Sequence, residues 1–409
     1  MNKYIFILLV SLVFDVKGEE DGGGALQYIS FVSCLFACFV LIAKLDAFSY
    51  GNLFTSRFGP SLIWMIAGSS VSAFVYDVEF GNYIRILIPY LFLFVGYAIG
   101  RKLYHSTDSV FQIMIVCSFF GSLATFLYAM FAQGISLQDA RWQILNPILF
   151  IGVPIAVGSV LQGRRYRLFN SMTILFAVSL VLISATRSWM IAFFLVISIG
   201  YIIADIERTG RTILISLLKV AVGLIAVGLF FVSIFSDEVG RMIERSIVGS
   251  EQGIDITTAT RLAEIDFQLS SWTETFLSTL IGKGLGSYYG FGGELMRYIL
   301  SVLGESGRVD DWWFAGHSFW VYSFYALGLL FGWVVPVMLV VYFGKSLIAI
   351  RRRMLFGFPL ENQLTFFLIF MSILLSTIGA NFMGGRQLAL YLGIILGMFE
   401  VLGGRPKNV

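Results

Sequence analysis

Residues Val110–Ala132 carry the sequence VFQIMIVCSFFGSLATFLYAMFA, a run of 23 residues without a charge. The apolar core of a bilayer takes roughly 20 residues of α-helix, so this stretch is typical of a membrane-spanning helix. The whole 409-residue chain has the same character, with 58% hydrophobic and 13% charged residues and a mean hydropathy of +0.85. Soluble proteins are about half apolar and about a quarter charged. The composition therefore excludes a cytosolic enzyme and a disordered chain.

Similar runs recur along the chain and predict an all-α polytopic membrane protein with about twelve spans. The first run is short enough for a signal peptide, but no small-x-small cleavage site follows it, which favours an uncleaved helix. We find no repeat or linker that divides residues 1–409, so the sequence predicts a single integral membrane domain. The predicted spans are Tyr4–Phe14, Ala25–Ile42, Pro60–Val75, Ile86–Gly100, Val110–Ala132, Ile144–Leu161, Leu168–Ile183, Trp189–Ala204, Ile213–Phe235, Phe319–Phe343, Leu364–Met383 and Leu388–Leu402.

Lysine and arginine are unevenly distributed between the connections. Alternate connections and both ends of the chain hold more than half of the 28 basic residues, and this excess marks the cytoplasmic side of a membrane protein. The pattern predicts two cytoplasmic termini. The net charge of only +3 gives no reason to expect a nucleic-acid partner. The predicted cytoplasmic basic residues are Lys3, Lys44, Arg57, Arg101, Lys102, Arg164, Arg165, Arg167, Arg208, Arg211, Lys345, Arg351, Arg352, Arg353, Arg405 and Lys407.

One outward connection, Ser236–Gly316, is far longer than the others. It has 81 residues, including 12 acidic and six basic ones, and lies between the ninth and tenth predicted spans. Inside it, apolar residues recur at helical spacing, with Thr260 as the expected N-cap and Glu264 in the first turn. We expect this amphipathic helix to lie at the outer membrane interface. Its recurring apolar residues are Leu262, Ile265, Leu269, Trp272 and Phe276.

Four arginines break the charge pattern because they lie in outward connections. Two of them, Arg187 and Arg386, lie in connections of a few residues at the membrane surface, where a buried charge is costly. A guanidinium group binds phosphate oxygens through two parallel hydrogen bonds, so the set suggests a phosphorylated lipid headgroup. For each arginine alone, snorkelling to water is the alternative. The four are Arg141, Arg187, Arg261 and Arg386.

His317 is the only outward histidine, and it follows the acidic pair Asp310 and Asp311. Its imidazole suits proton transfer or a hydrogen bond to a sugar or phosphate, although an interfacial histidine without chemistry is the alternative. Asp310, Asp311 or Glu305 could be the base instead. The chain has two histidines and three cysteines without a close cluster, which predicts no metal and no cofactor. The other histidine, His105, is predicted to be solvated and without function.

Two glycine patterns lie near His317. The segment Gly282–Gly286 lacks the strand and the Gly-Lys-Ser/Thr sequence of a nucleotide loop, so it favours a simple turn. A close approach of its backbone to a lipid-borne substrate is the alternative. Gly328 and Gly332 form a G-x-x-x-G pattern that allows close helix packing.

In this order and topology, the residues resemble the O-antigen ligase and polymerase superfamily of bacterial envelope proteins. Arg141 and Gly152 also fit an R-x10-G pattern of the polymerases, whereas Phe331 departs from the polymerase pattern after the histidine. The segments that carry the resemblance are Ala185-Thr186-Arg187-Ser188-Trp189, Thr260-Arg261-Leu262, Gly282-Lys283-Gly284-Leu285-Gly286-Ser287 and His317-Ser318 with nine residues before Gly328.

The resemblance implies a C-type glycosyltransferase-like fold in the bacterial inner membrane with a periplasmic active face. It implies a metal-independent inverting transferase whose donor is an oligosaccharide on undecaprenyl diphosphate and whose acceptor is a glycan or lipid A core. A chain-length regulator is a further expected partner. The implied catalytic residues are His317, Arg187 and Arg261, and Arg141 matches the polymerase motif. Position and charge add Arg386, Asp310 and Asp311 as substrate-binding candidates.

Three functions remain open at this point. The Arg141 pattern favours a polymerase that joins repeat units. A ligase to lipid A core, or a transferase to protein, shares the same arginine and histidine layout. A lipid-linked glycan transporter is the alternative from another class, but a transporter should place charges or broken helices near the bilayer midplane. The predicted spans are nearly free of charge, and Arg85 and Lys219 lie near span ends.

Overall fold

The computed structural model describes most of the chain, and every element in the described residues is helical. Within these described residues, five helical stretches are long and apolar enough to cross a membrane, and four shorter apolar helices accompany them. The chain is therefore an α-helical membrane protein, and the count of twelve spans stays a prediction. The described residues are 2–11, 13, 25–136, 142–164, 166–184, 186–209, 215–223, 256–290, 316–360, 362–378 and 380–403.

The predicted spans overlap helices throughout the described residues, although some bounds differ. Residues 215–223 of the predicted span Ile213–Phe235 are helical, and residues 224–235 lie outside the described residues. The helices are α1 (Asn2–Ser11), α2 (Ala25–Leu45), α3 (Tyr50–Leu53), α4 (Gly59–Val75), α5 (Phe80–Leu103), α6 (Thr107–Leu127), α7 (Leu149–Leu161), α8 (Arg167–Ser184), α9 (Arg187–Thr209), α12 (Ile256–Trp272), α13 (Phe276–Ile281), α15 (Phe319–Phe331), α16 (Val334–Leu355), α17 (Asn362–Ser376) and α18 (Arg386–Gly403).

The predicted span Phe319–Phe343 is wrong as a single helix. Gly328 has φ 64° and ψ −173°, which interrupts the helical path inside α15, and α16 begins only at Val334. Glycine reaches this conformation because it has no Cβ. The helix that is long enough to span a membrane is therefore α16, and α15 is a separate short helix before it.

The centre of the molecule is formed by helices that are apolar on all sides. In α18, Leu388–Phe399 is buried almost completely, and the middle of α17 is equally buried. A helix that is hydrophobic all round belongs inside a bundle, because a surface helix needs only one apolar stripe. Helices α2, α8 and α9 expose more of their apolar side chains, as expected for the lipid-facing layer.

The crossing of α5 and α18 relies on a G-x-x-x-G sequence in each helix, Gly96–Gly100 and Gly393–Gly397. A Cβ atom on Gly96 would lie 2.4 Å from the carbonyl oxygen of Leu390, and one on Gly397 would lie 2.2 Å from that of Tyr97. The two backbones are thus in direct contact. Small residues allow such approaches between membrane helices and increase their van der Waals packing.

A buried carboxylate stabilises one end of this helix crossing. Glu400 on α18 is 11% exposed and forms an ion pair with Arg101 at the end of α5. The hydroxyls of Tyr97 and Tyr342 donate to the same carboxylate, and the backbone N–H of Arg57 donates at 2.9 Å. Because a buried charge is stable only when it is paired and hydrogen-bonded, Glu400 joins α5, α16 and α18 at this end.

Other connections that the sequence assigns to the cytoplasmic side also contact one another. Arg164 lies 2.6 Å from Asp108 and donates to Asn362 at 2.7 Å, so three separate connections meet at its guanidinium group. Glu207 at the end of α9 accepts the backbone N–H of Leu360 at 2.9 Å. These contacts join the start of α6, the segment after α7, the end of α9 and the start of α17.

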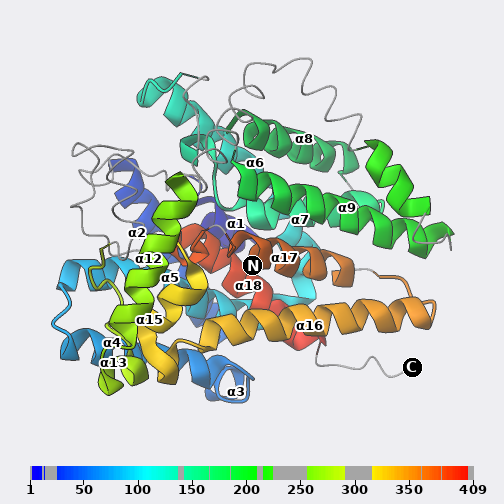
Figure 1. Cartoon of the computed structure of the whole chain (residues 1–409). Coiled ribbons are helices and arrows are strands. Elements are labelled where there is room, and N and C mark those ends of the chain that lie inside the picture. Colours follow the sequence, from blue (N-terminus) through cyan, green and yellow to red (C-terminus); the bar gives the residue numbers. More distant parts are fainter. Residues whose placement is uncertain are drawn as a thin grey trace.

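Helix α12 has a different orientation from the long helices. In Figure 1 it is steeply inclined to α8, α9 and α16, which run in a roughly common direction. Leu262 and Leu269 are each 41% exposed, whereas Glu264 and Gln268 are buried. The predicted amphipathic helix is confirmed over Ile256–Trp272, but two of its polar side chains, Glu264 and Gln268, face the protein, and Phe276 begins the separate helix α13. The N-cap prediction for Thr260 is wrong, because α12 begins at Ile256 and Thr260 lies within it.

Candidate functional site

His317 and Glu264 form the centre of the candidate site. The backbone N–H of His317 donates to Oε1 of Glu264 at 2.7 Å, and its Nδ1 lies 2.7 Å from Oε2 of the same carboxylate. The Glu264 side chain is 1% exposed, and the His317 side chain is 44% exposed. A shielded carboxylate thus holds an imidazole ring that is open to the surroundings.

The Glu264 carboxylate has further polar neighbours. Gln268, one turn along α12, donates from Nε2 to Oε1 of Glu264 at 3.0 Å. Burial raises the pKa of the nearby Tyr289 phenol, and the Glu264 carboxylate raises it further, so the phenol stays protonated. A buried carboxylate needs such donors because it has lost its water. The carboxylate therefore has a fixed position before any substrate arrives.

The start of α15 positions His317 on the other side of this contact. A Cβ atom on Gly316 would lie 2.4 Å from the ring of Tyr322, so only glycine fits immediately before His317. Trp320 donates from its indole N–H to Oγ1 of Thr377 at 2.9 Å, which ties the first turn of α15 to the end of α17. These contacts hold His317 over Glu264.

The glycine segment Gly282–Gly286 is a turn packed against other backbone, as the favoured interpretation predicted. The N–H groups of Lys283 and Gly284 donate to Tyr325 and Ala326 in α15, at 2.8 and 2.9 Å. The N–H of Gly286 donates to the hydroxyl of Tyr322 at 3.3 Å. Because these donors are already bonded to the protein, the segment does not offer them to a phosphate.

Gly328 does not act through the G-x-x-x-G helix contact that the spacing predicted. A Cβ atom there would lie 2.3 Å from the nitrogen of Gly282 and equally close to the carbonyl oxygen of Leu280. The glycine segment therefore packs against α15 at the point where Gly328 interrupts the helix. Phe331 fills space against Gly68 of α4 and lies 5.3 Å from the ring of Trp64, so its residue type follows from packing.

The predicted arginines are distributed over three helices. Arg261 lies on α12, three residues before Glu264, and residues at this spacing share one helix face. Arg187 is the first residue of α9 and is exposed. Arg386 is the first residue of α18, with its guanidinium group 5.1 Å from the ring centre of Phe31.

Arg261 therefore lies one helical turn from Glu264, whereas Arg187 and Arg386 begin two other helices. At the start of a helix the helix dipole favours an anion. The remaining predicted site residues, Arg141, Asp310 and Asp311, and the alternative base Glu305, lie outside the described residues.

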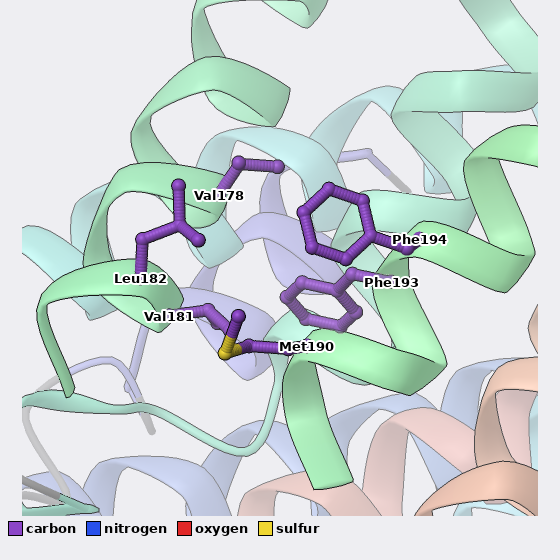
Figure 2. A pocket seen from close by; sticks show the side chains of 6 residues that line it. All are labelled: Val178, Val181, Leu182, Met190, Phe193 and Phe194. Atoms are coloured by element: carbon purple, nitrogen blue, oxygen red, sulfur yellow. The ribbon is translucent and has the colours of Figure 1, made fainter. Parts of the chain in front are cut away.

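A small apolar cavity lies between α8 and α9, in the first turns of α9 after Arg187. Figure 2 shows three side chains from each helix around it. Such a lining offers no hydrogen bond to a sugar. The lining residues are Val178, Val181, Leu182, Met190, Phe193 and Phe194.

Glu264, Gln268 and Tyr289 were missed as site residues by the sequence analysis, which placed Glu264 only in a helix start. One signal was present. Glu264 interrupts the apolar spacing of its helix three residues after Arg261. Gln268 follows at the next turn, so these two polar residues share one face of the helix. Their partner His317 is 53 residues away, and no local pattern connects the two.

Comparison with known proteins adds no family. No protein-family model matches the sequence, and no curated protein matches it. Among the residues that the structure describes, no group of three or more His, Cys, Asp and Glu side chains could hold a metal ion.

Proposed function

We propose that the chain is a glycosyltransferase that acts at the periplasmic face of a bacterial inner membrane on glycans carried by undecaprenyl diphosphate. Within this class we propose an O-antigen or related surface-polysaccharide polymerase that joins repeat units. The observation that carries the proposal is the contact between the exposed His317 ring and the buried Glu264 carboxylate. It supplies a group able to accept a proton at the end of the bundle remote from the Arg164 and Glu400 contacts.

The chemistry follows from the proposed donor. The sugar C1 carries a diphosphate-lipid leaving group, and an acceptor hydroxyl attacks C1 from the opposite face and inverts its configuration. His317 accepts the hydroxyl proton. Negative charge develops on the departing diphosphate, and fixed arginines stabilise such charge better than water because they need no reorganisation.

The arginines support this assignment through their positions. Arg187 and Arg386 combine a guanidinium group with a helix N-terminus, and both features favour phosphate oxygens. Arg261 is on the same helix face as Glu264 and could contact the phosphate next to the reacting C1.

The broken helix α15 is the feature that would favour a transporter, because transporters use discontinuous helices at their binding sites. Here, however, backbone N–H groups of the glycine segment bond to the carbonyls of Tyr325 and Ala326 just before the break. The polar groups at the break therefore bond to protein and do not line a path. This favours a fixed interfacial site over transport.

A gel of surface polysaccharide from the native host with this gene deleted tests the proposal. A single repeat unit on lipid A core is the expected result, because ligation continues without polymerisation. Bare core, with long glycan accumulating on undecaprenyl diphosphate, would identify a ligase instead. An unchanged ladder would contradict a role in this polysaccharide, and the other surface glycans of the host would then be analysed in the same strain.

A further inference from the structure

We propose that Glu264 is the positioning residue of the site, and that it holds neutral His317 in the tautomer with hydrogen on Nδ1. The proton-accepting nitrogen is then Nε2. The catalytic consequence rests on the proposed function, whereas the tautomer itself can be tested without any substrate.

The geometry fixes the ring from two directions. One oxygen of the Glu264 carboxylate accepts the backbone N–H of His317, and the other lies 2.7 Å from Nδ1 of its ring. An ionised carboxylate can only accept hydrogen bonds, so Nδ1 must carry the hydrogen. In a neutral imidazole the lone pair is then on Nε2.

The surroundings of Glu264 make this a fixed arrangement. Its carboxylate is 1% exposed and also accepts the amide N–H of Gln268 at 3.0 Å. The phenol of Tyr289 is a titratable group next to it, and it stays protonated because burial and Glu264 raise its pKa. The carboxylate is shielded from water while the His317 ring is 44% exposed. The ring can therefore meet a substrate without moving its anchor.

In the proposed glycosyl transfer, the acceptor oxygen forms a bond to the sugar C1 while its proton passes to Nε2 of His317. The bond from C1 to the diphosphate oxygen breaks, and its electron pair stays on the diphosphate. His317 becomes an imidazolium beside the buried Glu264 carboxylate, which stabilises it as the aspartate does in serine-hydrolase triads. The imidazolium later returns its proton to water.

The test uses the nitrogen NMR spectrum of the full chain labelled with ¹⁵N-histidine in lipid bilayers at neutral pH. The chain has only two histidines, so the exposed His105 is replaced by His105→Gln and all signals come from His317. We expect a protonated Nδ1 and an unprotonated Nε2. In the Glu264→Met variant the acceptor is gone, and we expect the Nδ1–H signal to fall. Asp266→Asn, an exposed position on α12, is the control and should leave the spectrum unchanged.

A ring with hydrogen on Nε2 alone, a doubly protonated ring, or an Nδ1–H signal unchanged in Glu264→Met would each overturn the proposal. If Glu264→Met does not insert, the spectrum of the parent chain decides, because hydrogen on Nε2 alone or on both ring nitrogens contradicts the proposal. In the host, the variant that shifts the tautomer should lose about 10²-fold or more of its product, the usual contribution of a positioned base. If the spectra are as expected but the Glu264 variant makes a normal amount of polysaccharide, the proposed function is contradicted. The tautomer assignment is then still supported by the spectra.

Discussion

At the scale of single residues, the proposed function depends on three side chains that come from different elements. Arg187 begins α9, Arg261 lies on α12, and His317 precedes α15. We expect Arg187→Ala, Arg261→Ala and His317→Ala each to abolish the polysaccharide product while the protein still inserts at normal levels. Arg187→Lys should also be impaired, because lysine retains the charge but loses the planar fork. Normal product from all three alanine variants, measured on the same gel, would remove the proposed site.

A second prediction at this scale concerns the Glu400 contact. In Arg101→Met the Glu400 carboxylate loses its ion pair in a place where it is 11% exposed. Breaking a buried pair by removing one partner costs roughly 3–5 kcal/mol. We expect a marked fall in the thermal unfolding temperature of the purified protein in detergent. Arg351→Met, an exposed position on α16, is the control and should unfold close to the parent temperature.

At the scale of elements, the α5–α18 crossing predicts the effect of side chains at its glycines. Gly96→Ala would place a Cβ atom 2.4 Å from the Leu390 carbonyl oxygen, so the helices must separate. We expect loss of folded protein on a membrane immunoblot. Gly344→Ala is the matched change in α16, where nothing lies within 4 Å of the added Cβ. It should raise stability by about 0.5–1 kcal/mol, because alanine favours helix over glycine. Equal protein levels for both variants would contradict the crossing.

The elements also show how far the sequence can be interpreted. Apolar runs predicted most helices because the bilayer requires a nearly fixed length of apolar residues. The same rule failed at Phe319–Phe343, because Gly328 interrupts the helix for a reason that lies in another segment, the close approach of Gly282. The α5–α18 crossing had a signal in its paired G-x-x-x-G sequences. The Glu264–His317 contact had none, because it joins a residue of α12 to one that precedes α15, 53 residues further along the chain.

At the scale of the whole molecule, the predicted topology can be tested by cysteine labelling. The three native cysteines, Cys34, Cys38 and Cys117, are all buried and should react slowly. His105→Cys and Ser270→Cys introduce exposed thiols at the two predicted sides. We expect a membrane-impermeant maleimide added from the periplasmic side to label Ser270→Cys and to leave His105→Cys unlabelled until the membrane is opened. The reverse pattern would invert the topology and remove the proposed periplasmic site.

The central position of α18 has a consequence for how the protein is made. Its glycines contact α5, its Glu400 pairs with Arg101, and the hydroxyl of Tyr391 donates to the carbonyl oxygen of Leu9 in α1 at 2.9 Å. Since α18 is the last of the described helices to leave the ribosome, α5 waits about 15 to 60 s for its partner at ordinary translation rates. During that interval the glycine face of α5 has only lipid or an insertion factor to cover it. If translation stops before Arg386, the chain therefore contains the other membrane helices but lacks α18, the helix at the centre of the bundle.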